Sequence, residues 1–208
     1  MKLYSMFEGG YRPGGYAFAS GYGPIDDLWF LNAKFLDRRR AYWKVNPEPP
    51  GLSIEPNAKS WPDFLGNGHS PPMFFVSERV VESLLRFGAS LGRRTEMPIA
   101  EINAKALKSK PPPRYFVVET IPGLEVDLVA TGFKLDAVGK AIVTPPPNPW
   151  PTPYHYRASS WNGSDLFSYR HFGPTDGPYT EMFCAERVKD LAQGEGWTNV
   201  RFVPLATT

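Results

Sequence analysis

Apolar residues occur along the chain in short groups, and the longest uninterrupted runs, such as Tyr115–Val118, contain four residues. Short apolar runs bounded by turn-forming residues are typical of β-strands, whereas a core helix spreads its apolar positions over roughly ten or more residues. The pattern therefore predicts mostly strands. We expect them at residues 2–7, 28–31, 41–45, 73–76, 96–100, 115–119, 124–129, 141–143, 154–157, 182–184 and 200–203.

Two stretches have the helical period instead. Apolar residues recur on one face of residues 77–87, where Ser77 is the expected N-cap and Gly88 the expected C-terminal stop. The Ser77 hydroxyl is expected to accept a hydrogen bond from a first-turn N–H group. A second helix is predicted at residues 185–193, where two glycines follow. Each predicted helix directly follows a predicted strand.

These two strand–helix stretches resemble each other. Residues 75–88 align with residues 183–196, at an offset of 108 residues, and share the sequence Glu-Arg-Val at the helix start and the closing glycine. Ser60-Trp61 also resembles Ser160-Trp161, at a slightly different offset. Such matches arise either from an internal duplication or from two elements that meet the same local requirement.

Proline is the outlier of the composition, at 23 of 208 residues, about twice its average usage. Because proline interrupts helix interiors and central strands, the regular elements must be short and the loops stiff. The sequence excludes an all-helical bundle. It predicts an α+β fold of short, mostly antiparallel strands with two short helices and long loops rich in proline and glycine.

Six of the nine residues at 145–153 are proline, which predicts an extended and stiff segment. The chain is long enough to bury a hydrophobic core without disulfide or metal staples. We therefore expect a single domain, 1–208, in which this segment joins two lobes at about 1–144 and 154–208.

The charge balance is nearly even, with 23 basic and 21 acidic residues and a net charge of +2. This balance excludes strong long-range attraction to nucleic acid or to an anionic membrane, so neither is expected as a partner. No apolar run approaches the ~20 residues of a membrane span, and the expected compartment is the cytoplasm. The single cysteine, Cys184, fits a reducing compartment and cannot form an internal disulfide.

Three features suggest chemistry, and each has a simpler explanation. Gly88–Gly92 matches the G-x-S-x-G nucleophile elbow of serine hydrolases, but a predicted helix enters this motif where a strand is required. Cys184 precedes a helix, where thiols are activated, yet it lies in an apolar strand, which favours a buried packing role. His69, His155 and His171 lack the spacing of a metal site, and neither a metal nor a cofactor is expected.

The two strand–helix stretches resemble a known family. Phe75–Leu84 and Phe183–Leu191 each place a strand before a helix, and Val200–Leu205 adds a strand with the pattern V-x-F-x-P-L. Over about residues 61–100 and 165–205, the chain resembles a bacterial family assigned as immunity proteins of polymorphic toxin systems. The resemblance implies a non-enzymatic protein that neutralises a cognate toxin, encoded nearby, by covering its active site.

The stretch 154–171 contains the candidate partner-binding residues. Aromatic and arginine side chains dominate protein-binding hot spots because they bury a large area at low entropic cost. If this stretch is exposed, it is the expected toxin-binding surface, and the alternative is that its aromatic residues fill the core of the second lobe. The candidates are Tyr154, Tyr156, Arg157, Trp161, Tyr169, Arg170 and His171.

Two other functions stay open on the sequence alone. One is a small hydrolase in which His155, His171 and a nearby aspartate, Asp165 or Asp176, carry out acid–base catalysis. The other is a sugar- or peptide-binding module whose glycine-rich N-terminal loop stacks tyrosines on a ligand. The tyrosines concerned are Tyr11, Tyr16 and Tyr22.

Overall fold

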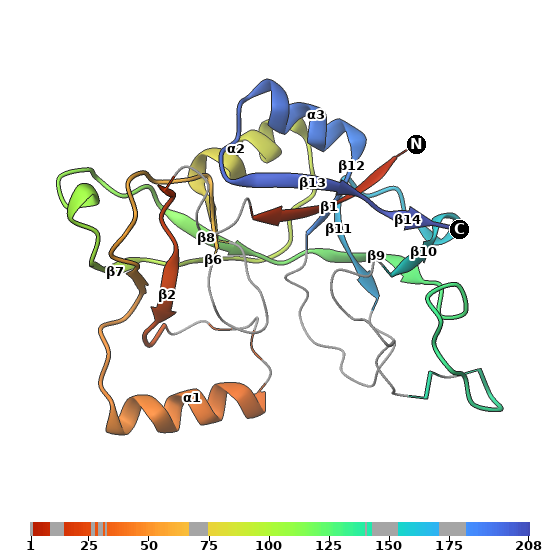
Figure 1. Ribbon diagram of the computed structural model, residues 1–208, viewed down its shortest axis with the longest axis horizontal. Coiled ribbons are helices and arrows are strands. Elements are labelled where there is room, and N and C mark those ends of the chain that lie inside the picture. Colours follow the sequence, from red (N-terminus) through yellow and green to blue (C-terminus); the bar gives the residue numbers. More distant parts are fainter. Residues whose placement is uncertain are drawn as a thin grey trace.

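The computed structural model describes residues 2–8, 15–25, 28, 31, 33–66, 75–139, 141–142, 154–170 and 182–208 of the chain. Fourteen strands and three α-helices lie within these ranges (Figure 1). The helices are α1 (Ala33–Val45), α2 (Glu78–Phe87) and α3 (Glu186–Gly194). Two short 3₁₀ turns are at Lys105–Leu107 and Ala158–Ser160.

The strands fall into two consecutive sets of seven. The first set is β1 (Leu3–Glu8), β2 (Ala19–Tyr22), β3 (Leu52–Ile54), β4 (Phe64–Leu65), β5 (Phe75–Ser77), β6 (Arg94–Glu96) and β7 (Ile99–Ile102). The second set is β8 (Tyr115–Val118), β9 (Ile121–Val126), β10 (His155–Arg157), β11 (Leu166–Arg170), β12 (Phe183–Ala185), β13 (Val200–Pro204) and β14 (Ala206–Thr207).

Two of the three sheets in the described residues are mixed. The largest has the order β13-β1-β12-β11-β9-β10-β14, and its β9–β11 and β10–β14 pairs are parallel. A second sheet, β2-β3-β7, contains the parallel pair β3–β7, whereas β4-β5-β8-β6 is antiparallel throughout. The α+β class is confirmed. Eight of the eleven strand pairs in the described residues are antiparallel, but the three parallel pairs make two of the sheets mixed, which the expectation of mostly antiparallel strands did not include. Strand direction in these long-range pairs is set by tertiary contacts, which a local pattern does not encode.

The two sets of strands form the same arrangement twice. Each strand of the first set corresponds to the strand numbered seven higher in the second set. The order β2-β3-β7 thus corresponds to β9-β10-β14, and each pair is antiparallel or parallel as its counterpart is. In the same way β4-β5-α2-β6 corresponds to β11-β12-α3-β13. The parallel β9–β11 pair has its counterpart in the hydrogen bond from the Ala19 N–H to the Gly66 carbonyl, at 2.9 Å. The resemblance between two helix stretches thus extends to two structural halves.

The first strand of each half pairs with strands of the other half. Strand β1 lies between β12 and β13, and β8 occupies the equivalent place between β5 and β6. The helix starts are bonded in the same way: the Glu78 N–H donates to the Arg114 carbonyl at 2.9 Å, and the Glu186 N–H donates to the Lys2 carbonyl at 3.1 Å. The two halves are therefore interlocked by a reciprocal exchange of strands.

The hydrophobic core also crosses between the halves. Helices α2 and α3 lie side by side in Figure 1, and buried residues of both pack in one cluster with Met6 of β1 and Leu166 of β11. The proline-rich segment 145–153 lies outside the described residues, but strands from both sides of it share the largest sheet. The expected division into lobes at 1–144 and 154–208 therefore does not coincide with a division of the sheets.

Most of the local predictions are confirmed within one or two residues, including both helices after their strands. Gly88 caps α2 with φ of 84°, and Gly196, at the equivalent place after α3, has φ of 65°. Such left-handed conformations favour glycine because a Cβ atom strains them. These two glycines are therefore the stop signals that the sequence predicted.

Several predicted strands are corrected. The expected strand at 41–45 is the second part of helix α1, whose alanine, leucine, lysine and arginine residues have high helix propensity. The strand expected at 96–100 is divided between β6 and β7, which lie in different sheets. The strand expected at 124–129 lies three residues earlier, as β9. Strands β2, β3, β4, β11 and β14 were not predicted, and in β2 and β11 glycine, serine and polar residues obscure the alternation. Of the strand expected at 141–143, Ala141 forms an isolated bridge, and of residues 28–31 only 28 and 31 are described.

Candidate functional site

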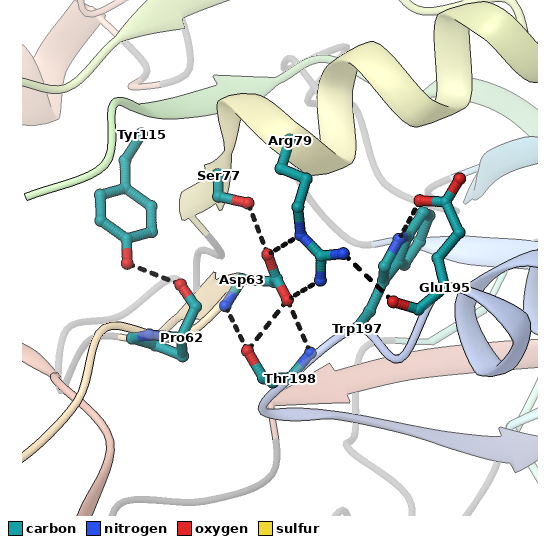
Figure 2. A network of polar contacts seen from close by, with 8 residues as sticks. All are labelled: Pro62, Asp63, Ser77, Arg79, Tyr115, Glu195, Trp197 and Thr198. Atoms are coloured by element: carbon teal, nitrogen blue, oxygen red, sulfur yellow. Dashed lines mark hydrogen bonds and ion pairs between the residues drawn. The ribbon is translucent and has the colours of Figure 1, made fainter.

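A polar network centred on Asp63 joins the two halves (Figure 2). Its Oδ1 accepts hydrogen bonds from Ser77 Oγ at 2.9 Å and from Arg79 Nε at 3.0 Å. Its Oδ2 accepts hydrogen bonds from Arg79 Nη2 at 2.5 Å, the Thr198 N–H at 2.8 Å and Thr198 Oγ1 at 3.0 Å. Arg79 Nη1 also donates to the Glu195 carbonyl at 3.1 Å. Asp63 and Arg79 come from the first half, and Thr198 and Glu195 from the second.

Secondary structure places each member of this network. Asp63 directly precedes β4, and its carbonyl accepts the Ser77 N–H at the β5–α2 junction, at 2.8 Å. Ser77 is the N-cap residue of α2, but its hydroxyl makes no cap hydrogen bond to the helix. The predicted capping role of this hydroxyl is therefore wrong. The Ser77 hydroxyl donates a charge-assisted hydrogen bond to the Asp63 carboxylate.

The Asp63 carboxylate is charged and fully engaged. Burial by itself would raise the pKa of Asp63, but hydrogen bonds from Arg79, Thr198 and Ser77 outweigh it and hold the pKa below its usual value. Its side chain is 10% exposed. A carboxylate held in its ionised form by five donated hydrogen bonds is a poor proton donor. The arrangement is therefore suited to holding the halves together rather than to acid–base chemistry.

The second half contains the equivalent ion pair. Asp165 directly precedes β11, its carbonyl accepts the Ala185 N–H at 2.9 Å, and its carboxylate accepts two hydrogen bonds from Arg187. The Arg187 guanidinium lies 4.8 Å from the ring centre of Phe87 in α2, so this pair also contacts the opposite half. The repeated pair therefore places an arginine of each helix at the boundary between the halves.

The network predicts a loss of stability in acid. Because the pKa of Asp63 is lower in the folded than in the unfolded chain, its stabilising contribution is present above the unfolded pKa and is lost as the pH falls through the folded pKa. We expect the free energy of unfolding to decrease as the pH falls below about 4. Asp63→Asn should flatten this slope in urea titrations across that range. An unchanged slope would assign the acid transition to Glu96, Asp127 or Glu195, whose pKa values are also lowered.

The aromatic residues of the predicted partner-binding stretch form part of a core. Tyr156 is buried and packs against Phe183, with ring centres 5.3 Å apart. Tyr169 stacks on Phe183 at 5.8 Å, and Tyr154 packs edge-to-face on Tyr169 at 5.9 Å. Trp161 packs on a further ring of the same cluster and donates its Nε1–H to a backbone carbonyl. The core-filling alternative thus describes most of these side chains.

Part of the predicted stretch still faces solvent. Arg157 is exposed and donates to Glu125 Oε2 at 3.1 Å, and Tyr154, Trp161 and Tyr169 are half-buried. Arg170 is described in its backbone only, and His171 lies outside the described residues. Of the five candidates whose side chains are described, four are thus buried or half-buried, and the partner-binding role of the stretch stays a prediction.

In the described residues, the structure does not bring together a site for either of the two alternative functions. The Asp165 carboxylate, one of the two aspartates considered for the hydrolase, is held by Arg187, and His171 and Asp176 lie outside the described residues. For the sugar- or peptide-binding module, Tyr22 is buried against Trp43 at 6.5 Å between ring centres and is not on the surface. Tyr16 is half-buried and Tyr11 is not described.

The G-x-S-x-G match at 88–92 follows the C-terminus of helix α2 and leads towards strand β6. A nucleophile elbow requires the opposite order, with a strand before the serine and a helix after it. This confirms that the structural context of the motif is absent.

Cys184 is buried in strand β12, as the packing interpretation predicts. Burial raises the pKa of its thiol to about 12, so the reactive thiolate is almost absent at neutral pH. We expect the native protein to resist a thiol reagent such as DTNB at about pH 8 and to react fully once denatured. Rapid labelling of the native protein would show that β12 opens or that the thiol is accessible.

Helix α1 is the main surface feature that the sequence analysis missed. Its exposed side chains include Arg38, Arg40 and Tyr42. The run Arg38-Arg39-Arg40 by itself indicates only a solvated face, and the apolar pattern beside it wrongly predicts a strand. Helix propensity summed over residues 33–45 was the signal that could have identified the helix.

Among the described residues, no group of histidine, cysteine, aspartate and glutamate side chains is arranged to hold a metal ion. No described helix has the length and apolar character needed to cross a membrane. A comparison of the chain with protein-family models finds no match, and a search of curated proteins finds no similar sequence.

Proposed function

We propose that this chain is a non-enzymatic immunity protein of the cytoplasm that binds a cognate bacterial toxin and covers its active site. The resemblance of about residues 61–100 and 165–205 to the polymorphic-toxin immunity family suggests this role. Those two stretches contain the repeated strand–helix units that build the core. They belong to the framework, and the contact surface must be sought elsewhere on the molecule.

The observation that carries the proposal is the exposure of helix α1. Of its thirteen residues, only Trp43 is buried. Tyr42 and Val45 are 45% and 76% exposed, and they stand among exposed arginines. Arginine and tyrosine are enriched in protein-binding hot spots because each combines a large contact area with directional polar groups. A surface of this composition is suited to a protein partner.

The framework behind this surface supports inhibition by occlusion. The exchanged strands β1 and β8 tie each half to the other, and the Asp63 network adds a second connection. A framework held at several points loses little conformational entropy when it binds, so more of the contact energy appears as affinity. Occlusion of an active site requires tight binding and no catalytic group.

A capture experiment in the native host tests the proposal. Tagged chain is purified from cells that express the neighbouring genes, and the retained proteins are identified by mass spectrometry at low and high salt. The proposal expects one stoichiometric partner that arrests growth when expressed alone and is harmless when co-expressed with this chain. A retained partner that is harmless by itself, or the absence of any retained partner, would overturn the immunity role.

A further inference from the structure

Helix α1 lies on an excursion of the chain, the segment between β2 and β3, which adds no strand to the sheets. Strands β2 and β3 pair directly, and the Gly23 N–H donates to the Gly51 carbonyl at 2.8 Å, so the chain between them leaves and returns at one point. In Figure 1 α1 lies along the lower edge of the molecule, away from α2 and α3. In the equivalent connection of the second half, the described residues 127–139 and 141–142 form turns and no helix.

The excursion is nevertheless held firmly on one side. Trp43 is 8% exposed, packs edge-to-face on Tyr22 and donates its Nε1–H to Glu48 Oε2 at 3.1 Å. The Arg39 guanidinium lies 4.9 Å from the ring centre of Tyr22 and 5.9 Å from that of Trp43. These contacts orient the helix, because they fix the face that contains Arg39 and Trp43 against β2.

The opposite face of α1 carries a concentrated positive charge. The helix has five basic residues and one acidic residue, a balance of +4, whereas the whole chain is +2. The rest of the chain is therefore −2. The exposed basic side chains are Lys34, Arg38, Arg40 and Lys44.

This charge pattern does not stabilise the helix. Lys34 and Arg38 are four residues apart, as are Arg40 and Lys44, and like charges at this spacing destabilise a helix. The first turn contains no acidic residue to interact with the helix dipole. The ion pair between Arg40 and Asp37 within this helix has a 3.8 Å separation and is largely exposed, so it contributes little.

We propose that the exposed face of α1 docks on an acidic protein surface, which on the proposed function is the surface of the toxin. Charge complementarity gives the basic residues stronger interactions than the single exposed Arg40–Asp37 pair provides within the helix. Ala41, Tyr42 and Val45 stand among them and supply apolar contact area. The helix is about 20 Å long, which suits a groove or cleft edge on a folded protein.

The same observations favour protein over nucleic acid as the partner. A nucleic-acid-binding surface depends on a broad positive field, and the residues outside α1 sum to −2. An exposed valine and tyrosine gain more from a protein surface than from phosphates.

Two charge-reversal variants test the docking face. Arg38→Glu with Arg40→Glu converts both like-charge pairs into opposite-charge pairs, which offsets the loss of the exposed Arg40–Asp37 pair, so α1 is expected to fold about as well as before. Lys105→Glu with Lys108→Glu makes the same total charge change at two other exposed lysines, next to a 3₁₀ turn. Circular dichroism and melting temperature check that all variants are folded. Arg38→Lys with Arg40→Lys keeps the charge and serves as the conservative variant.

The probe is the protein retained by the wild-type chain in the capture experiment, with its dissociation constant measured at about 50 and 300 mM NaCl. We expect the α1 reversal to weaken binding at least tenfold at low salt, and the Lys105/Lys108 reversal and the lysine variant to change it less than about threefold. Equal binding by the wild type and the α1 reversal overturns the docking face but leaves the immunity role standing. An α1-dependent partner that is not toxic supports the docking face and overturns the immunity role.

A nucleic-acid arm completes the test. A 20-base-pair duplex and a transfer RNA serve as probes under the same salt conditions, with the same three variants. Wild-type binding to either probe that is lost in the α1 reversal, together with an unaffected protein partner, would overturn the assignment to an acidic protein. If the wild-type chain retains no partner in host cells, both proposals are overturned.

Discussion

Replacement of Asp63 by alanine is expected to lower the free energy of unfolding by about 3–4 kcal/mol. The substitution leaves the Thr198 N–H, the Ser77 hydroxyl and the Arg79 guanidinium without the acceptor that they share. Loss of an acceptor that is 10% exposed costs more than loss of a surface ion pair. Water can hydrate Arg79, which is 48% exposed, but it reaches the buried Ser77 poorly. Denaturant unfolding followed by circular dichroism and tryptophan fluorescence measures the change.

Asp165→Ala is the matched control for this substitution. It removes the equivalent ion pair of the second half. The Asp165 side chain is as buried as that of Asp63, at 9% exposed, but its carboxylate accepts two hydrogen bonds from Arg187, which is 61% exposed and can be hydrated. We therefore expect a loss of about 1–2 kcal/mol. Equal losses for the two aspartates would show that the contacts of Asp63 with Thr198 add no stability. A loss near zero for Asp63→Ala would contradict the role assigned to the network.

Ser5→Pro is expected to cost about 3 kcal/mol or more and to act mainly on the opposite half of the chain. Ser5 pairs with Phe183 on one side and with Val203 on the other. Proline cannot donate a hydrogen bond and is tolerated poorly in a central strand. Amide hydrogen exchange should therefore accelerate first in β12, β13 and α3, although residue 5 belongs to the first set of strands.

Two further variants make the test of strand exchange specific. Val117→Pro, at the equivalent position of β8, should accelerate exchange in β5 and β6, because Val117 pairs with Thr95. Lys2→Pro lies before β1 and should be tolerated, since proline is accepted at a strand start. Exchange that accelerates in the same half as the substitution, for both Ser5 and Val117, would contradict the interlocked arrangement.

The local elements were accessible from the sequence wherever the signals were short-range. The helical period of 77–87 and the glycine at 88 predicted α2 and its end, because both depend on residues within one or two helical turns. The offset of 108 residues between the two helix stretches indicated a possible repeat from the amino-acid pattern alone. Helix α1 was not predicted because its exposed basic residues interrupt the apolar helical period on which the prediction relied.

The candidate sites were accessible only in part. Aromatic content singled out residues 154–171, but composition cannot tell whether a tyrosine faces the core or the solvent, and Tyr156 faces the core. Asp63 was not singled out at all. Its role depends on Thr198, which is 135 residues away in the chain, and no local pattern reports such a contact.

The sequence by itself determined the α+β class, the buried packing role of Cys184 and two strand–helix units that end in left-handed glycines. These follow from propensity, spacing and burial preference, which act between near neighbours. Only the tertiary structure decided that β1 and β8 each pair with strands of the other half and that Asp63 joins the halves. It also decided that the basic face of α1 is exposed. Backbone hydrogen bonds between strands are nearly independent of side-chain identity, so a sequence can specify a strand without specifying its neighbour.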